Sequence, residues 1–267
     1  MMRTVGCIGC GNMGGAILGG LVDALGDSYA FAGHTRTPGR IAPLAAKGVR
    51  VKPDAHALAR DSEIIILAVK PYQIAAVVEE ILPALNSDKL LISIAAGVSL
   101  KRLKDLCRGA SPMARCMPNT PALVGEGVFA LCLEDEALSQ TSKDEVLALF
   151  GALGLCLPLT EAQFTAFSAL VGAGPAYVFE MMRGLVQAGV TLGFPHQQAR
   201  ELVVALFAGS ARLAGEREEH LMQLRDAVCS PAGLTIAGVN HLDRAGLAGL
   251  LVEAVLKANT RGREMEE

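Results

Sequence analysis

Three glycines near the start of the chain have the spacing of a phosphate-binding loop. Gly9, Gly11 and Gly14 follow a short apolar run that ends at Ile8, and they open a segment with helical spacing. In this motif the first glycine makes a tight turn, the second lets the backbone approach a pyrophosphate, and the third lets the helix pack on the strand. The motif predicts a dinucleotide-binding site, with the phosphates at the helix N-terminus. The alternative is that the glycines serve only a tight turn.

A second group of residues bears on which dinucleotide is bound. An acid at the end of the second strand would bind a free ribose 2′-hydroxyl, and none is present there. The chain instead reads His34, Thr35, Arg36 and Thr37. A guanidinium among hydroxyls suits a 2′-phosphate. The sequence therefore predicts that NADPH is preferred and that NADH is possible. The alternative is that Arg36 extends into solvent.

The segment from Ser230 to Thr235 could bind a carboxylate. Ser230 has the character of a helix N-cap and Pro231 that of a first-turn residue, and the small residues after them leave backbone amides open. Open amides at a helix N-terminus attract anions. We predict that Ser230, Gly233, Leu234 and Thr235 bind the substrate. The alternative is an ordinary capped helix start.

The helical part of the chain has few groups that could take a proton from an alcohol. No lysine lies between Lys143 and Lys257, and His196, His220 and His241 are in turn-like or charged surroundings where we expect surface residues. Oxidation of an alcohol needs such a base. A protonated imine accepts hydride directly and needs mainly orientation and a hydrogen bond to its nitrogen. The sequence therefore favours reduction of a C=N bond.

Two of the cysteines form a CxxC pair, Cys7 and Cys10, which could suggest a redox or zinc site. One falls in a predicted strand and the other in the glycine turn, and neither a second pair nor a histidine at ligand spacing accompanies them. We predict small core residues and no metal site. Core positions are also expected for the cysteines at 107, 116, 132 and 156.

The composition excludes several classes of protein. The chain has 267 residues, 51% of them hydrophobic and 19% charged, so a globular fold is expected. A net charge of −3 gives no basic field for nucleic acid. The start lacks the pattern of a signal peptide, and the uncharged stretch 162–179 holds polar residues and a Gly-Pro breaker. With seven cysteines, an odd number, a cytoplasmic protein without a membrane partner is expected.

The hydrophobic pattern predicts an α/β fold with two domains. Predicted strands cover 4–8, 29–33, 63–69, 89–94, 112–117, 128–133 and 156–159. Helix starts are expected at Pro71, at Ser99, and at Ser142 with Glu145 as a capping box. Strands that are apolar throughout suit a parallel sheet covered on both faces. We predict a Rossmann-like doubly wound sheet over 1–160.

A helical domain is predicted over 161–267. Between Ala162 and Ala199 the only charged residues are Glu180 and Arg183, so these helices are apolar nearly all round. A domain of this size cannot bury several such helices by itself. We predict an obligate homodimer whose helices interlock.

Several motifs together resemble the pyrroline-5-carboxylate reductases, which make proline from its cyclic imine with NADPH or NADH. The resemblance covers essentially the whole chain. It rests on the glycine loop with Asn12-Met13 and on the segments 68–71, 94–98, 115–121, 172–177 and 228–235. The segments 172–177 and 228–235 are the most distinctive, whereas the glycine loop is common to many dinucleotide-binding proteins.

The resemblance implies roles for individual residues. The cofactor would lie along the glycine loop with Cys10, Asn12 and Met13, the loop 34–37, and the residues Val69, Lys70, Pro71, Ala95, Ala96 and Gly97. Thr235, with its hydroxyl near the ring nitrogen, would be the catalytic residue, and Ser230, Gly233 and Leu234 would hold the carboxylate. Glu161 stands where the family has an acid close to the substrate. The helical domain would form dimers, which in the family often stack into larger rings.

Three positions depart from the family pattern. Ala232 stands where the family usually has a glycine, and Leu234 replaces a small residue, so the preferred substrate could shift. Ala55 stands where an asparagine is common, which removes one expected cofactor contact. Two other functions stay open: an imine reductase for another cyclic imino acid, and a regulatory protein that binds the dinucleotide without catalysis.

Overall fold

The computed structural model describes residues 2–266, with nothing stated for the side chains of Pro38 and Glu266. The chain forms two compact units, residues 2–173 with 259–266 and residues 174–258. The change from strands to helices comes before the change of unit, because the helical residues 161–172 belong to the first unit. The domain boundary at residue 160 stays a prediction.

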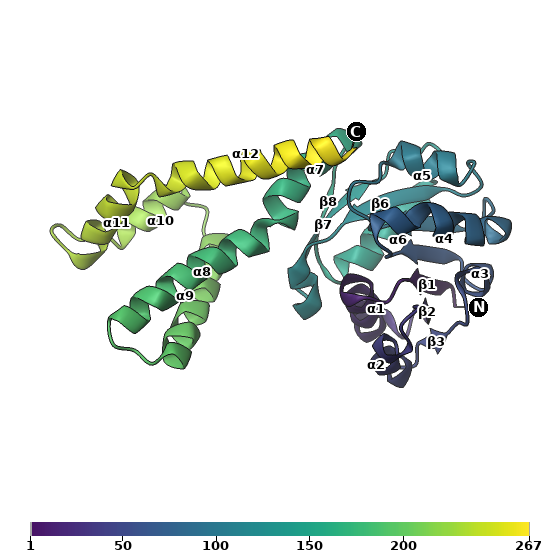
Figure 1. The fold of residues 1–267 in the computed structure, drawn as a ribbon, viewed down its shortest axis with the longest axis horizontal. Coiled ribbons are helices and arrows are strands. Elements are labelled where there is room, and N and C mark those ends of the chain that lie inside the picture. Colours follow the sequence, from purple (N-terminus) through teal and green to yellow (C-terminus); the bar gives the residue numbers. More distant parts are fainter. Residues whose placement is uncertain (1, 267) are drawn as a thin grey trace. The chain divides into compact units, whose positions relative to one another are not determined.

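The first unit is built on one eight-stranded sheet with the order β3-β2-β1-β4-β5-β6-β7-β8 (Figure 1). The strands are β1 Thr4–Ile8, β2 Ala30–His34, β3 Arg50–Val51, β4 Ile64–Leu67, β5 Leu90–Ser93, β6 Met113–Met117, β7 Gly127–Cys132 and β8 Gly154–Pro158. Neighbours from β3 to β6 are parallel, β7 is antiparallel to β6, and β8 is parallel to β7. The strand order changes direction at β1, which is where ligands bind in such sheets.

The predicted Rossmann-like sheet is confirmed, and each predicted strand has a counterpart. The strand that the sequence did not predict, β3, has two exposed residues and no apolar run. It forms because Arg50 and Val51 pair with β2 at the edge of the sheet, which is a tertiary contact.

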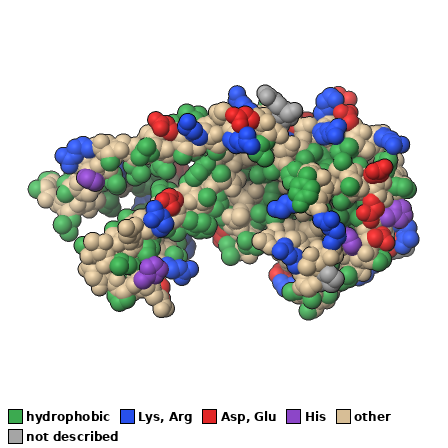
Figure 2. Space-filling view, in the orientation of Figure 1, with side chains coloured by type: hydrophobic (Ala, Val, Ile, Leu, Met, Phe, Trp, Pro, Cys, Tyr) green, Lys and Arg blue, Asp and Glu red, His purple; other side chains and the backbone are tan. Residues whose placement is uncertain are grey.

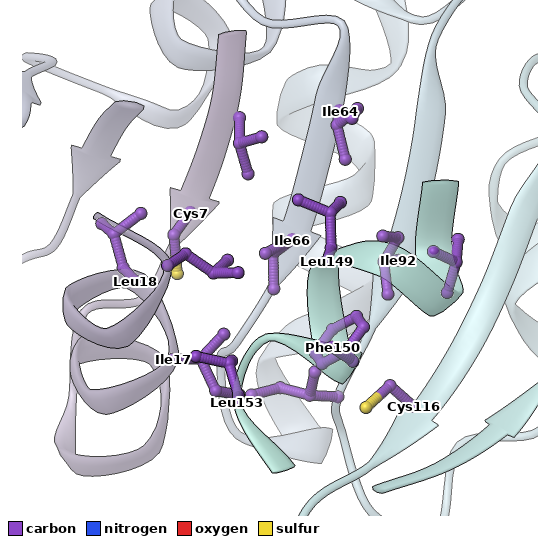
Figure 3. Close-up of a cluster of buried hydrophobic side chains, with 14 of the residues drawn as sticks. Cys7, Ile17, Leu18, Ile64, Ile66, Ile92, Cys116, Leu149, Phe150 and Leu153 are labelled. Atoms are coloured by element: carbon purple, nitrogen blue, oxygen red, sulfur yellow. The ribbon is translucent and has the colours of Figure 1, made fainter. Parts of the chain in front are cut away.

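Two hydrophobic clusters cover the two faces of the sheet. In β4, Ile64 and Ile66 belong to one cluster, whereas Ile65 and Leu67 belong to the other. Figure 3 shows the first cluster, where Ile66 lies near Leu149 and Phe150. Because successive strand residues point to opposite faces, a strand that is apolar throughout must be buried on both.

Helices connect and cover the strands of the first unit. The α-helices are α1 Asn12–Leu25, α2 Ala42–Ala46, α3 Ala55–Arg60, α4 Ile74–Ile81, α5 Leu100–Leu106, α6 Gln140–Gly151 and α7 Phe164–Phe167. The short 3-10 helices are η1 Pro38–Arg40, η2 Pro71–Gln73, η3 Leu82–Ala84, η4 Thr120–Val124 and η5 Glu161–Gln163, and η6 Ser168–Gly172 is a π-helix.

Two helix starts test the predicted capping residues. Ser99 caps α5 as predicted, and its hydroxyl accepts a hydrogen bond from the Arg102 amide at 3.1 Å. The capping box at Ser142 is wrong, because α6 begins one turn earlier and Ser139 caps it. Glu145 has another role: its carboxylate accepts hydrogen bonds from Arg3 and from the Tyr29 hydroxyl.

The second unit consists of helices and includes most of α12. Its helices are α8 Gly174–Thr191, α9 His196–Glu216, α10 Leu221–Ala227, α11 Leu234–Arg244 and α12 Leu247–Glu266, the last of which continues into the first unit. Large apolar side chains are exposed on it, among them Phe179 at 63% and Leu206 at 56%. Figure 2 shows hydrophobic side chains at the surface of these helices. Within residues 2–266 no helix is both long and apolar enough to cross a membrane.

Candidate active site

The glycine loop has the geometry that a bound pyrophosphate needs. Gly9 has a φ of +100°, and a Cβ there would lie 2.7 Å from the Ala68 carbonyl oxygen. A Cβ on Gly14 would lie 2.3 Å from the Gly9 carbonyl oxygen, which no side chain tolerates. The nearest atom to a Cβ on Gly11 is Arg40 Nη1 at 3.6 Å, an ordinary van der Waals distance, so packing does not require glycine there. The outer two glycines therefore allow close packing, and Gly11 leaves room for a ligand.

A cavity of about 500 Å³ lies beside the glycine loop. It contains eight of the residues that the sequence assigned to the cofactor: Gly9, Gly11, His34, Thr35, Arg36, Thr37, Val69 and Lys70. These residues come from the ends of β1, β2 and β4, which are neighbours in the sheet. The His34 carbonyl also accepts a hydrogen bond from the Gly9 amide at 2.8 Å, so β2 holds the glycine loop in place.

Other predicted cofactor residues lie outside this cavity. Cys10, Gly14 and Ala95 are buried, and Met13 packs against the core. Asn12 accepts a hydrogen bond from Arg40 at 3.3 Å, and Ala96 is exposed. Pro71 and Gly97 line a second cavity of about 650 Å³. A cofactor contact by any of these residues stays a prediction.

The cavity also contains polar residues that the sequence did not identify: Arg40, Tyr72, Gln73 and Glu80. Arg40 follows Arg36 by four residues and could have been noticed as a second cation in the same loop. Tyr72 comes directly after the predicted helix start at Pro71 and lines both cavities. No motif or spacing in the sequence indicated that Gln73 and Glu80 line this cavity.

Ala55 lines the same cavity, at the position where the family commonly has an asparagine. Its amide donates a hydrogen bond to Glu80 Oε1 at 3.0 Å, and its side chain is buried. Compared with that family pattern, alanine leaves this part of the cavity lining without a polar side chain.

The predicted substrate segment lies in the second unit and forms a turn before α11. The expected N-cap at Ser230 is wrong, and so is the helical position of Pro231: α11 begins at Leu234, with Gly233 as its N-cap residue. The Ser230 carbonyl accepts a hydrogen bond from the Gly233 amide at 3.0 Å, which closes the turn. No described side chain caps the first amides of α11. Open amides of this kind suit a carboxylate.

The cause of the later helix start is Ala232, whose φ is +58°. A helix cannot continue through a left-handed residue. The backbone therefore takes, with an alanine, the conformation for which the family usually has glycine.

Ala232→Gly is expected to leave the free energy of unfolding unchanged or to raise it by up to about 1 kcal/mol. Removing Cβ relieves the left-handed strain, whereas the greater freedom of unfolded glycine offsets part of the gain. Urea denaturation of the two proteins measures the difference. A variant that is less stable by about 1 kcal/mol or more would show that Ala232 is not strained.

Glu161 lies in the first unit, where its carboxylate already has partners. Oε1 accepts hydrogen bonds from Arg115 Nη1 and, at 3.0 Å, from the Leu100 amide. Oε2 is buried and, in the part of the chain that the structure describes, accepts no hydrogen bond. A substrate contact by Glu161 stays a prediction.

The cysteines behave as core residues. All seven are free, and Cys7 and Cys10 are buried in the core between the sheet and α1. Burial raises the pKa of Cys107 and of Cys156 to about 11, so these thiols stay protonated near neutral pH. Such thiols are poor nucleophiles and poor metal ligands.

The fold and the site define the class of protein as a dinucleotide-dependent oxidoreductase. A family model described as "NADP oxidoreductase coenzyme F420-dependent" matches residues 4–97, and one described as "Pyrroline-5-carboxylate reductase dimerisation" matches residues 161–265. The chain is 35% identical to the pyrroline-5-carboxylate reductase of Pisum sativum over 264 residues, which cover 98% of this chain and 96% of the relative. It is 34% identical to that of Escherichia coli K12, with both chains covered completely.

Solved structures give the same result. The pyrroline-5-carboxylate reductase of Coxiella burnetii is 31% identical, with a TM-score of 0.90 and both chains covered completely. The Plasmodium falciparum pyrroline carboxylate reductase with NADP bound is 29% identical, with a TM-score of 0.88, and 99% of this chain and 100% of that one are covered. This chain belongs to the pyrroline-5-carboxylate reductase family. The predicted resemblance, the fold class and an NAD(P)H cofactor are confirmed.

Proposed function

We propose that this protein reduces 1-pyrroline-5-carboxylate to L-proline, the last step of proline biosynthesis, with NADPH as its preferred reductant. The observation that carries the proposal is similarity over the full length of reductases of this name. The cavity beside Gly11 and the uncapped start of α11 support it, because they supply a place for a dinucleotide and a place for a carboxylate.

The residues of this chain would bind and orient the reactants. Bound NADPH supplies a hydride to C5 of the imine, whose C=N bond becomes a C–N single bond. The amides of Gly233 and Leu234, with the Ser230 hydroxyl, hold the substrate carboxylate. The Thr235 hydroxyl lies in the first turn of α11 and hydrogen-bonds the ring nitrogen, where it helps to move a proton. A protonated imine accepts hydride directly and its nitrogen keeps the proton, so the reduction needs no general base.

The preference for NADPH rests on cations at the end of β2. Arg36, Thr35 and Thr37 line the cavity, and Arg40 lies over the glycine loop. A 2′-phosphate adds charge that a guanidinium can bind through a pair of hydrogen bonds. NADH lacks this group and would bind more weakly.

The first test is the loss of NADPH absorbance when purified protein is mixed with racemic pyrroline-5-carboxylate, with NADH run beside it. We expect rapid oxidation that is faster with NADPH at low cofactor concentration. No oxidation with this imine but rapid oxidation with another cyclic imino acid would favour the related imine reductase. Binding of NADPH without oxidation by any imine would favour a regulatory protein.

Self-association agrees with the match to a dimerisation family. The homodimer, and larger rings built from it, are part of the proposal. Support comes from the second unit, where large apolar side chains remain exposed in the single chain. Exposed apolar surface on this scale is typical of a permanent interface.

We expect the native protein to sediment as a dimer or larger assembly. Leu206→Glu should shift it toward monomer, because a charged side chain replaces an exposed apolar one on α9. Lys101→Gln, on an exposed face of the first unit, serves as the control and should leave the sedimentation unchanged. A native protein that is a stable and active monomer would contradict the proposal.

We also propose a cytoplasmic location and a domain boundary after residue 160. Seven free cysteines support the location, because an oxidising compartment would favour their pairing.

A further inference from the structure

The first unit (the sheet unit) is connected to the second unit (the helical unit) by a segment that contacts one sequence motif. Residues 161–172 form η5, α7 and the π-helix η6. The first stretch of the sheet unit ends at Ala173, just after this segment. The motif is the stretch from Arg115 to Asn119 at the end of β6, part of one of the segments on which the family resemblance rests. It lines neither the dinucleotide cavity nor the second cavity, so those sites do not explain it.

Arg115 binds the beginning of this segment. Its side chain is 5% exposed on an inner strand of the sheet, and Nη1 donates a hydrogen bond to Glu161 Oε1. Arg115 Cζ also lies 4.6 Å from the centre of the Phe164 ring, which is buried. The carboxylate and the aromatic ring both stabilise the buried guanidinium, because an unpaired charge is costly away from water. The pair therefore fixes the start of the segment on the sheet.

The same motif contacts the end of the segment. Asn119 is 6% exposed, and its Nδ2 donates a hydrogen bond to the Val171 carbonyl at 3.5 Å. Met117 Cε lies 3.1 Å from the position of a Cβ on Gly172, so the methionine packs directly against this glycine. The motif thus holds both ends of the segment 161–172.

The segment also contacts the part of α12 where the chain re-enters the sheet unit. The chain returns to the sheet unit at Asn259, within α12. A Cβ on Gly262 would lie 2.7 Å from Thr165 Cγ2, so the last turns of α12 pack closely on α7 (Figure 1). Both connections to the helical unit are therefore attached to residues 161–172.

We propose that Arg115 and Glu161 form a positioning pair for the reduction. The inference rests on the proposed function in one respect: the dinucleotide cavity belongs to the sheet unit, and the substrate segment 230–235 belongs to the helical unit. With the pair intact, both connections start from fixed places on the sheet. Without it, the segment loosens and the two connections no longer start from fixed places, so the reactants are held less precisely, although the dinucleotide cavity stays whole.

The contacts of Glu161 support this role. Oε1 accepts hydrogen bonds from Arg115 and from the Leu100 amide, whereas Oε2 is buried and, among the described residues, has no hydrogen-bond partner. In this proposal Glu161 acts on the reaction through Arg115.

The test compares Glu161→Gln, Arg115→Met and the double variant. We expect kcat/KM for the imine to fall on the order of ten- to a hundred-fold in each, because small misplacements of reactants are costly. The Kd for NADPH from direct titration should be nearly unchanged, and amides 164–172 should exchange hydrogen faster. The loss in the double variant should be smaller than the product of the two single losses, since both variants disrupt the bond between Arg115 and Glu161. If Arg115→Met does not fold, Arg115→Lys takes its place.

Asp135→Asn is the matched control. Asp135 is buried, pairs with Lys104 at 2.6 Å and accepts a hydrogen bond from the Met113 amide, so its loss weakens the same unit without removing a bond to residues 161–172. It should lower Tm and leave kcat/KM for the imine nearly unchanged. An equal kinetic loss in Asp135→Asn would overturn the inference, because general destabilisation would then explain it.

Two other results would also overturn it. Native kcat/KM in Glu161→Gln would exclude positioning, and a kinetic loss without faster exchange of amides 164–172 would indicate direct contact with the substrate. A native protein that reduces no imine would contradict the proposed function instead. In that case unchanged exchange in Glu161→Gln would still contradict the positioning pair, and faster exchange would support it.

Discussion

Thr235→Ala is expected to lower kcat for reduction of the imine about 100-fold, because one hydrogen bond to the reacting nitrogen and a path for its proton are lost. The residue lies in the first turn of α11, where the amides that we propose as the carboxylate site also lie. Removing a hydroxyl there leaves the helix intact, since Gly233 and not Thr235 occupies the N-cap. Stopped-flow or steady-state oxidation of NADPH measures the change.

Thr235→Ser is the matched control, because it keeps the hydroxyl and removes only a methyl group. It should retain most of the native kcat. The Kd for NADPH should be nearly unchanged in both variants, since the dinucleotide cavity belongs to the other unit. A native turnover in Thr235→Ala would show that the hydroxyl has no part in the reaction.

Arg36→Ala is expected to raise KM for NADPH on the order of 10- to 100-fold, because a charge-assisted hydrogen bond to a phosphate contributes about 1.5–3 kcal/mol. KM for NADH should change little, since NADH has no group for this guanidinium to bind. The ratio of the two kcat/KM values would then move toward NADH. Raising the salt concentration should weaken NADPH binding to the native protein more than to the variant.

Arg40 provides the comparison for this experiment. Its Nη1 lies 3.6 Å from the position of a Cβ on Gly11 and donates a hydrogen bond to Asn12, so it stands over the loop that would hold the pyrophosphate. Arg40→Ala should therefore weaken NADPH and NADH alike. Equal losses for both cofactors in Arg36→Ala would mean that Arg36 does not recognise the 2′-phosphate.

Local signals predicted the elements that carry the cofactor loop. Continuous apolar runs such as Ile64–Leu67 indicate strands that are buried on both faces, and the glycine spacing indicates the turn after β1. These features depend on neighbours in sequence, so the sequence contains them directly. The cap at Ser99 was predictable for the same reason, because it depends only on neighbouring residues.

Predictions failed where several local arrangements were acceptable. Ser139 and Ser142 could each begin α6, and only packing of the helix on the sheet selects Ser139. Ser230 is a good N-cap by type, but the left-handed backbone at Ala232 delays α11 until Leu234. The exposed pair of residues in β3 forms a strand only because β2 is beside it.

The sequence by itself determined which chemistry we propose: a glycine loop for a dinucleotide, Arg36 for a 2′-phosphate, and Ser230 to Thr235 for a carboxylate. Residue type and short spacing suffice for these inferences. The tertiary structure decided which distant residues meet. Tyr72 lines the same cavity as Arg36, and Arg115 meets Glu161 across 46 positions of sequence. The reason is that side-chain contacts between distant segments depend on strand order and helix packing, which local patterns do not specify.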